Sequence, residues 1–165
     1  MNAGPLRWGV LGTASIALRR IIPALHASSI NDVVAIASRD LGRAEHAAKA
    51  AGVGRAFGSY QDLLDDPSID AVYVPLPNHL HVPWSVKALE AGKHVLCEKP
   101  LGLNAADARV LIDAATLHSR LTVMEAFMYR SHPRWKQVRQ MVVDGAVGNL
   151  GCVRTIFSYD NRNPA

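Results

Sequence analysis

"RWGVLGTASIA", residues 7–17, is the segment that decides the fold, because it has the pattern of a buried strand that runs through a glycine turn into a helix. Leu6 to Leu11 is a short apolar run, which is typical of a central strand in a parallel sheet. Gly12 permits a tight turn, and Ser15 can cap the helix that follows. Backbone N–H groups and the positive end of the helix dipole would then face a phosphate group.

The turn matches only part of the dinucleotide-binding pattern G-x-G-x-x-G/A. Gly12 supplies the first glycine, Ala14 replaces the second, and Ala17 fills the third position, where alanine is allowed. Taken alone, this match is equally compatible with an ordinary strand-to-helix turn built from small residues. As a dinucleotide site, the turn would hold the pyrophosphate against Gly12, Thr13, Ala14, Ser15 and Ile16.

The composition indicates one ordinary globular domain by length. The chain has 165 residues, of which 49% are apolar, and this excludes a disordered protein. No apolar run reaches the roughly 18 residues that cross a bilayer, and the first residues lack the features of a signal peptide, so we expect a cytoplasmic protein without a membrane partner. The net charge of +4 comes without a run of basic residues, which argues against nucleic acid as a partner.

The cysteine and histidine residues do not form the pattern of a metal site. Cys97 and Cys152 lie far apart and belong to no CxxC pair, so we interpret both as packing residues with reduced thiols. His79 and His81 are close in sequence, but no carboxylate or third histidine is near them. We therefore expect no metal, and we expect His81 to cap or pack against a helix over residues 82–91.

The second apolar segment, residues 31–39, indicates the type of cofactor. In dinucleotide sites an acidic residue at the end of this strand binds the ribose 2′-hydroxyl of NAD, whereas arginine accommodates the 2′-phosphate of NADP. Here Ser38 and Arg39 stand at that end, with Arg43 one helical turn later. A guanidinium group pairs well with phosphate, so the sequence favours NADP over NAD. Two points oppose this prediction: Arg39 could be only a solvated residue at a helix start, and Asp40 is acidic.

Strands and helices alternate along the chain with short connections. Helical spacing over residues 16–27 is interrupted by Pro23, which predicts a helix in two pieces. Helical patterns over residues 41–51 and 60–65 precede a buried strand over residues 69–75. This alternation predicts an α/β fold, a doubly wound parallel sheet with right-handed crossovers.

Two polar segments follow buried strands and would lie at the carboxyl edge of the sheet, where such folds bind ligands. The first is "LPNHLH", residues 76–81, and the second is Glu98-Lys99-Pro100, which follows a strand over residues 93–97. An ionisable pair at the exit of a buried strand is costly unless it has a function. A Glu–Lys pair that only lines the rim of the sheet explains the pattern equally well.

Taken together, the segments "WGVLGTASIA", "VVAIASRD", "YVPLPNHLH", "AGKHVLCEKPLGLN" and "MEAFMYRSHP" resemble the glucose–fructose oxidoreductase/inositol dehydrogenase (Gfo/Idh/MocA) family in order and spacing. Within the family, the chain is most similar to the NADP-dependent branch of dihydrodiol dehydrogenase and D-xylose dehydrogenase. The resemblance implies that Lys99 is the active-site lysine and that Glu98 contacts the nicotinamide ribose. It implies that Asn78 and His81 lie beside the cofactor, and that the nicotinamide end is bordered by Tyr129, Arg130 and His132.

The residues and the resemblance together give one expected set of cofactor-binding residues. It consists of Gly12, Thr13, Ala14, Ser15, Ile16, Ser38, Arg39, Arg43, Pro75, Leu76, Asn78, His81, Glu98, Lys99 and Arg130.

Two departures from the family pattern bear on these expectations. Ala14 narrows the approach to the pyrophosphate by one methyl group. Family members also carry a second half, an open sheet that holds the substrate pocket, whereas this sequence stops at residue 165. The resemblance therefore predicts a Rossmann domain over residues 1–123 and the start of a truncated α+β substrate domain over residues 124–165. The second part should contain a helix over residues 133–144, a turn over 145–148 and a strand over 149–160.

The sequence thus predicts the cofactor half of an NADP(H)-dependent oxidoreductase that transfers hydride to or from a CH–OH group of a sugar, polyol or cyclic diol. Lys99 would act as the acid–base catalyst on the oxygen of that group. In this chain, an unpaired strand over residues 149–160 favours self-association. We expect the full-length protein to be a homo-oligomer through its C-terminal sheet. We expect the isolated chain to lack turnover. Two alternatives stay open: a non-catalytic NADP-binding sensor module, and a truncated inactive fragment.

Overall fold

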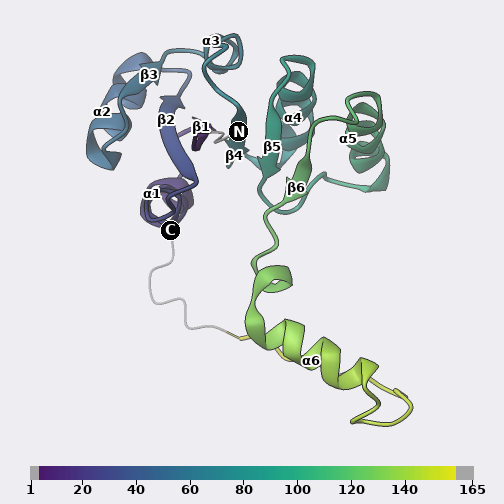
Figure 1. Ribbon diagram of the computed structural model, residues 1–165. Helices are drawn as coiled ribbons and strands as arrows, with labels where there is room; N and C mark the ends of the chain where they lie inside the picture. Colours follow the sequence, from purple (N-terminus) through teal and green to yellow (C-terminus); the bar gives the residue numbers. More distant parts are fainter. Residues whose placement is uncertain (1–3, 159–165) are drawn as a thin grey trace. The chain divides into compact units, whose positions relative to one another are not determined.

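The apolar run around Val10 forms the central strand β1 (Leu6–Leu11), as its pattern predicts. The computed structural model describes residues 4–158, in two units that divide after Ala126. The first unit contains a parallel sheet of six strands in the order β3-β2-β1-β4-β5-β6 (Figure 1). The other strands are β2 (Asn31–Ala37), β3 (Arg55–Phe57), β4 (Ala71–Val74), β5 (His94–Cys97) and β6 (Val123–Glu125). The predicted doubly wound parallel sheet is confirmed.

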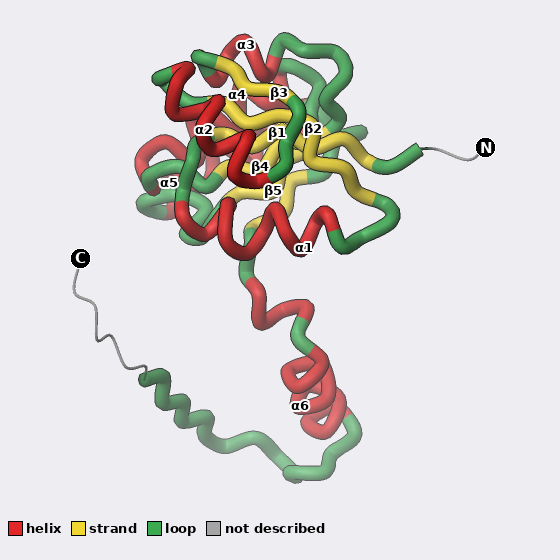
Figure 2. Tube along the Cα trace, turned by 90° about the vertical axis from the view of Figure 1, so that its left-hand side faces the viewer, coloured by secondary structure: helices red, strands yellow, loops and turns green. Residues whose placement is uncertain are grey.

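Helices cover both faces of this sheet (Figure 2). Val10 and Tyr73 point to one face, where they pack with buried residues of α1 (Ile22–His26) and α2 (Leu41–Ala51). Leu11 and Val72 point to the other face, where the neighbouring elements are α3 (Tyr60–Leu64), α4 (His81–Glu90) and α5 (Ala105–Leu117). Because both faces are covered, the central strand β4 is apolar and buried along its whole length.

The strand order reverses between β1 and β4. The chain winds outward from β1 through β2 to β3, and then returns to place β4 on the other side of β1. The loops that leave β1 and β4 therefore run to opposite faces, which opens a crevice at the carboxyl ends of these two strands. Ligands of open α/β sheets bind at this reversal point.

The helix after β1 is interrupted before Pro23, as predicted. A π-helical segment, η1 (Ala17–Ile21), precedes α1. Proline has no N–H group to donate to the preceding turn, and a wider π turn accommodates such a break. The prediction that Ser15 caps the helix is wrong: the helical backbone already includes Ser15, and the first helical bond runs from the Leu18 N–H to the Ala14 carbonyl (3.2 Å). The cap position therefore belongs to Ala14.

Charged groups at the amino edge of the sheet are bound to partners. The Asp70 carboxylate accepts hydrogen bonds from the Arg7 backbone N–H (2.9 Å), Nε (2.8 Å) and Nη2 (2.7 Å). The side-chain hydrogen bonds from Arg7 hold the pKa of Asp70 below its ordinary value. Arg55 likewise forms a salt bridge with Asp66.

Within its described residues, 127–158, the second unit contains two helical segments, η3 (Met128–Ser131) and α6 (Pro133–Val143). The expected turn follows α6, since Gly145 and Gly148 both have positive φ, at 76° and 65°. The strand expected over residues 149–160 is absent from the part that the structure describes, which has no regular structure over 149–158; the last two residues of that prediction lie outside the described range. A strand needs a hydrogen-bonded neighbour, and this segment has none within the described residues.

The division after Ala126 leaves β6 in the first unit, three residues beyond the expected boundary at Val123. The assignment of the remainder to a substrate domain stays a prediction. Among the described residues, no helix combines the length and the apolar character that a membrane span requires.

The Arg7–Asp70 contact predicts a pH-dependent contribution to stability. We expect Asp70→Asn to lower the free energy of unfolding by about 1 kcal/mol at pH 7, since the contact is partly exposed. The folded pKa of Asp70 is below its unfolded value, so this stabilisation is present above the unfolded value and is lost as the pH falls through the folded one. Urea titrations should show the difference at pH 7 and a smaller difference at pH 3. Asp113→Asn, on the exposed face of α5, is the control. An equal loss at both pH values would contradict the assignment.

Candidate functional site

A groove of about 520 Å³ lies at the carboxyl ends of β1, β2 and β4, at the reversal point of the sheet. Eight of its lining residues belong to the set expected from the sequence: Gly12, Thr13, Ala14, Ser38, Arg39, Arg43, Pro75 and Leu76. Asp40, Tyr60 and Pro77 complete the lining. The fold thus brings together residues from four separate segments of the chain, and the expected residues come from three of them.

The glycine turn on one side of the groove requires a residue without a side chain. Gly12 has a φ of 105°, and a Cβ atom at this position would lie 3.1 Å from Cδ2 of Leu76. Ala17 is fully buried against β1, which explains the small third residue of the pattern. Ala14 carries no side-chain oxygen to bind the N–H groups of the first helical turn, where Ser15 and Ile16 are exposed. These N–H groups are available to an anion.

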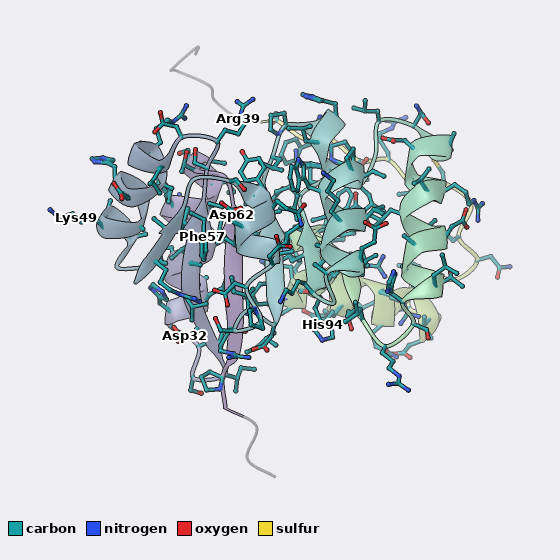
Figure 3. All side chains as sticks on the ribbon, turned by 90° about the horizontal axis from the view of Figure 1, so that it is seen from above. Asp32, Arg39, Lys49, Phe57, Asp62 and His94 are labelled. Atoms are coloured by element: carbon teal, nitrogen blue, oxygen red, sulfur yellow. The ribbon has the colours of Figure 1, made fainter. Side chains whose placement is uncertain are left out.

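The end of β2 supplies cationic side chains to the same groove. The Ser38 N–H donates to the Phe57 carbonyl (3.0 Å), and the Ser38 side chain is buried. Arg39 and Arg43 line the groove with exposed side chains. Figure 3 places Arg39 at one end of the strands, away from Asp32 and His94 at the other end.

Asp40 is occupied as the cap of α2. Its carboxylate accepts a hydrogen bond from the Arg43 N–H (2.8 Å), which satisfies the first turn of the helix. This local role explains an acidic residue next to the expected phosphate site.

The Glu98-Lys99-Pro100 segment leaves β5 at the same edge, and hydrogen bonds to two neighbouring strands, β4 and β6, fix it and the residue after it. The Glu98 N–H donates to the Val74 carbonyl of β4 (3.1 Å). The Tyr73 hydroxyl, also from β4, donates to Glu98 Oε1 (2.6 Å). The Leu101 N–H donates to Oε1 of Glu125 at the end of β6 (2.8 Å). Burial, followed by the bond to Glu98, raises the pKa of Tyr73, so its hydroxyl stays a donor.

Glu98 and Lys99 do not pair with each other. Oε1 of Glu98 is bound to the Tyr73 hydroxyl, and Oε2 accepts from the Lys99 backbone N–H (3.2 Å). The Lys99 side chain is exposed, and within residues 4–158 its ammonium makes no hydrogen bond or ion pair. The same residue range offers no ion-pair partner to Arg39 or Arg43. This edge of the sheet therefore presents free cations. Both interpretations of Glu98 and Lys99, a functional pair and a pair that only lines the rim, stay open.

The two residues expected from the loop after β4 take different places. Asn78 begins a 3₁₀ segment, η2 (Asn78–Leu80), and is exposed. His81 is only 1% exposed, and its ring nitrogens contact the carbonyl oxygens of Pro100 and Leu76, both at 2.7 Å. His81 therefore packs at the start of α4, and it presents no surface to a ligand in this structure.

Arg130 lies in the second unit. It borders a hollow of about 350 Å³ together with Tyr129, Trp135, Lys136 and Arg139. Residues 127–165 contain six Lys/Arg and two Asp/Glu, whereas residues 1–126 contain twelve of each. The whole net charge of +4 thus belongs to the second unit. The expected contact between Arg130 and the cofactor stays a prediction.

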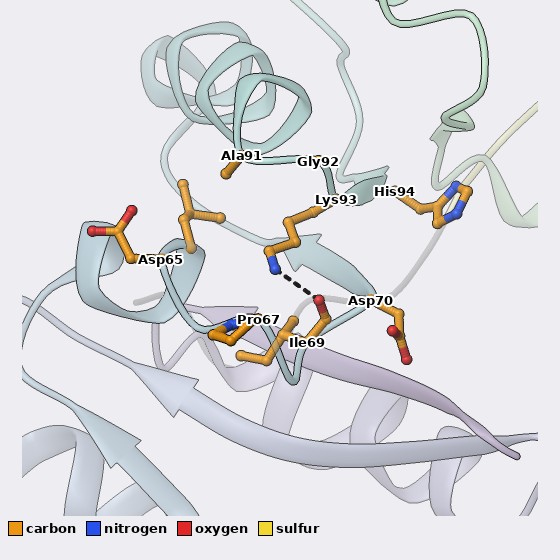
Figure 4. Close-up of a pocket in the computed structure, with 9 residues that line it drawn as sticks. Asp65, Pro67, Ile69, Asp70, Ala91, Gly92, Lys93 and His94 are labelled. Atoms are coloured by element: carbon orange, nitrogen blue, oxygen red, sulfur yellow. Dashed lines mark hydrogen bonds between the residues drawn. The ribbon is translucent and has the colours of Figure 1, made fainter.

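A further hollow lies at the opposite, amino edge of the sheet and is lined by Asp70, Lys93 and His94 among others (Figure 4). The Lys93 ammonium is buried and donates to the carbonyls of Asp66 (2.7 Å) and Ile69 (2.8 Å). Burial lowers the pKa of Lys93. These contacts close the loops before β4 and β5, so this hollow is structural. Within residues 4–158, no group of three His, Cys, Asp or Glu side chains could hold a metal ion.

Sequence reasoning missed Tyr73 and Glu125 as supports of the site. The signal for Tyr73 was a hydroxyl in the middle of the buried run "AVYV", because a buried hydroxyl needs a partner. No local pattern pointed to Glu125.

The chain is similar to known oxidoreductases. Residues 6–127 match a family model described as "Oxidoreductase family, NAD-binding Rossmann fold". An uncharacterized oxidoreductase from Rhizobium meliloti is 47% identical over 96% of this chain and 47% of its own length. D-xylose 1-dehydrogenase (NADP(+)) 2 from Haloferax volcanii is 44% identical over 93% of this chain and 46% of its own length. The chain spans about half the length of the curated relatives it matches.

The fold is also similar to that of a solved oxidoreductase structure. The 3-ketoreductase from Actinomadura kijaniata, in complex with NADP and TDP-benzene, is similar with a TM-score of 0.79 and 45% identity. The match covers 86% of this chain and 43% of the ketoreductase chain.

The two cysteines should differ in reactivity. Cys97 is buried beside Glu98, and burial raises its pKa to about 11, whereas Cys152 is exposed, so the interpretation of Cys152 as a packing residue is wrong. We expect an aromatic disulfide reagent at pH 8 to label Cys152 rapidly, and Cys97 only after unfolding, because the thiolate is the reactive form. Cys152→Ser should remove the rapid phase, and Cys97→Ser should leave it unchanged. A rapid phase that survives Cys152→Ser would show that Cys97 is accessible.

Proposed function

This chain belongs to the Gfo/Idh/MocA family of oxidoreductases, and from that premise we propose that it is the NADP-binding half of an enzyme that transfers hydride to or from a CH–OH group of a sugar, polyol or cyclic diol. The observation that carries the proposal is the groove at the reversal point. It joins the glycine turn, whose N–H groups are available to an anion, to Ser38 and Arg39 after β2 and to Arg43 on α2. A cofactor with a 2′-phosphate would meet cations at that end, where an NAD site has a carboxylate.

The residues present fit a dinucleotide. The missing Cβ at Gly12 leaves room beside Leu76, and the N–H groups of the following helical turn suit the pyrophosphate. Pro75 and Leu76 also line the groove, and Asn78, two residues later, is exposed. Glu98, held by Tyr73, would accept hydrogen bonds from the ribose next to the nicotinamide. When bound, the cofactor supplies hydride chemistry.

The proton of the substrate oxygen is the part of the reaction that the protein must handle. Three exposed side chains at this edge have no ion-pair partner in the described residues, namely Arg39, Arg43 and Lys99, and of these only lysine can give up its proton. We assign to it the role of acid in the reduction of a carbonyl group and of base in the oxidation of an alcohol. Its ammonium would also stabilise negative charge that develops on the oxygen during reduction.

The names of the relatives support a carbohydrate as the substrate. One relative is a xylose dehydrogenase, and the solved ketoreductase holds a TDP compound. We propose that the residues that determine substrate selectivity lie in the second half of these proteins. A cytoplasmic location and a homo-oligomer formed through that half are further parts of it.

Cofactor choice tests the groove. We expect the chain to bind NADP(H) more tightly than NAD(H), and Arg39→Ala to weaken NADP binding by about 10- to 100-fold with little effect on NAD, since a charged hydrogen bond to the 2′-phosphate would be lost. Calorimetric titration with both cofactors measures this. Arg109→Ala, an exposed arginine on α5, is the matched control. Equal losses for the two cofactors would refute the 2′-phosphate site.

Substitution of Lys99 tests the enzymatic part. In the complete protein we expect Lys99→Met to lower kcat by ~10²–10⁴-fold, because a positioned acid–base group typically contributes this much. The Kd for NADP should change far less, since the interaction forms mainly in the transition state. Lys49→Met, an exposed lysine on α2, should leave both quantities unchanged. Retained turnover in the Lys99 variant would exclude Lys99 as the catalyst, and tight NADP binding without any turnover in the wild type would favour the sensor module.

A further inference from the structure

His81 connects the two loops that border the proposed cofactor groove and the proposed catalytic lysine. Its Nε2 lies 2.7 Å from the carbonyl oxygen of Leu76, in the loop after β4. Its Nδ1 lies 2.7 Å from the carbonyl oxygen of Pro100, which directly follows Lys99 after β5. The ring is 1% exposed, so water cannot replace either contact. We propose that His81 is a doubly protonated imidazolium that fixes both loops and acts as the positioning residue for Lys99.

The protonation state follows from the partners. A carbonyl oxygen can only accept a hydrogen bond, so each contact needs an N–H on the histidine side. A neutral imidazole has one N–H and one lone pair, and in either tautomer the lone pair would face an oxygen at 2.7 Å. Only the imidazolium donates at both nitrogens. Two short bonds to carbonyl oxygens are therefore the signature of the charged ring.

The surroundings of the ring act on its positive charge in both directions. His81 is the first residue of α4, and the positive end of the helix dipole opposes a cation there. Burial of the ring also opposes the charged form. Lys99, between Glu98 and Pro100, adds a positive charge, but its side chain is exposed to solvent. The two carbonyl dipoles that point at the ring favour the charged form.

The positioning role of His81 rests on the proposed catalytic function of Lys99, whereas the protonation state of the ring does not. With His81 in place, the segment that carries Lys99 is bound on one side to β4 and β6 and on the other to the loop that lines the groove. Without His81, the carbonyl oxygens of Leu76 and Pro100 lose their donors, and the distance between groove and lysine is no longer set by one rigid ring. A shift of about 1 Å at a reacting group can cost on the order of 10²-fold in rate.

The ring state can be measured on the chain itself. Long-range ¹H–¹⁵N spectra of the ¹⁵N-histidine-labelled chain at pH 7 should show two N–H protons and two protonated nitrogens for one of the seven histidines. His81→Gln should remove these signals, and His79→Gln, an exposed neighbour, should leave them in place. A single protonated nitrogen at His81 would overturn the proposal, whether or not the chain binds NADP.

The positioning role is tested by a double-mutant cycle in the complete protein. We expect His81→Gln to lower kcat by about 10- to 100-fold while KM for NADP changes less than about threefold. Because His81 acts through Lys99, adding His81→Gln to Lys99→Met should cause little further loss. Full additivity of the two losses would show that His81 only stabilises the fold. A wild-type protein without turnover would refute the proposed function but leave the spectroscopic result decisive for His81.

Discussion

The pairing of β1 with β2 on one side and β4 on the other is the constraint on which the structure depends. It places the reversal of strand order beside the glycine turn, so the first helix starts where two loops diverge. Gly12 then has to adopt a positive φ next to Leu76, and a methyl group at that position would crowd this side chain. The order of the strands therefore sets the position of the groove, and single side chains only shape it.

Charged side chains have partners at the amino edge of the sheet, whereas the cations at the carboxyl edge have none among the described residues. At the amino edge, Arg7 pairs with Asp70, Arg55 pairs with Asp66, and Lys93 donates to two carbonyl groups. At the carboxyl edge, the exposed cations have no carboxylate partner among the described residues; these are Arg39, Arg43 and Lys99. The first unit has no net charge, so this asymmetry comes from arrangement and not from composition. Free cations gathered at a ligand-binding edge favour an anionic cofactor.

The sequence predicted those parts of the site that depend on local pattern. The glycine turn, the end of β2 and the loop after β4 each follow a buried strand, and parallel strands bring their carboxyl ends to one edge. The hydrogen bonds that Tyr73 and Glu125 make to the Glu98 segment could not be predicted in this way, because both residues belong to neighbouring strands. The same limit applies to His81, whose position at the head of a helix predicted packing but not the two carbonyl groups that it joins.

The strand predicted over residues 149–160 did not form over residues 149–158, because a strand depends on contacts that its own sequence does not contain. Alternation of apolar and polar residues records which face a strand would bury, but the strand forms only when a neighbour binds its N–H and C=O groups. Within the described residues no such neighbour exists, and Val153 and Ile156 are exposed. The Pro133–Val143 helix, by contrast, satisfies its own backbone and forms as predicted. Helical predictions therefore hold for a unit taken by itself, whereas a strand prediction is conditional on the rest of a sheet, and so is any substrate pocket built on it.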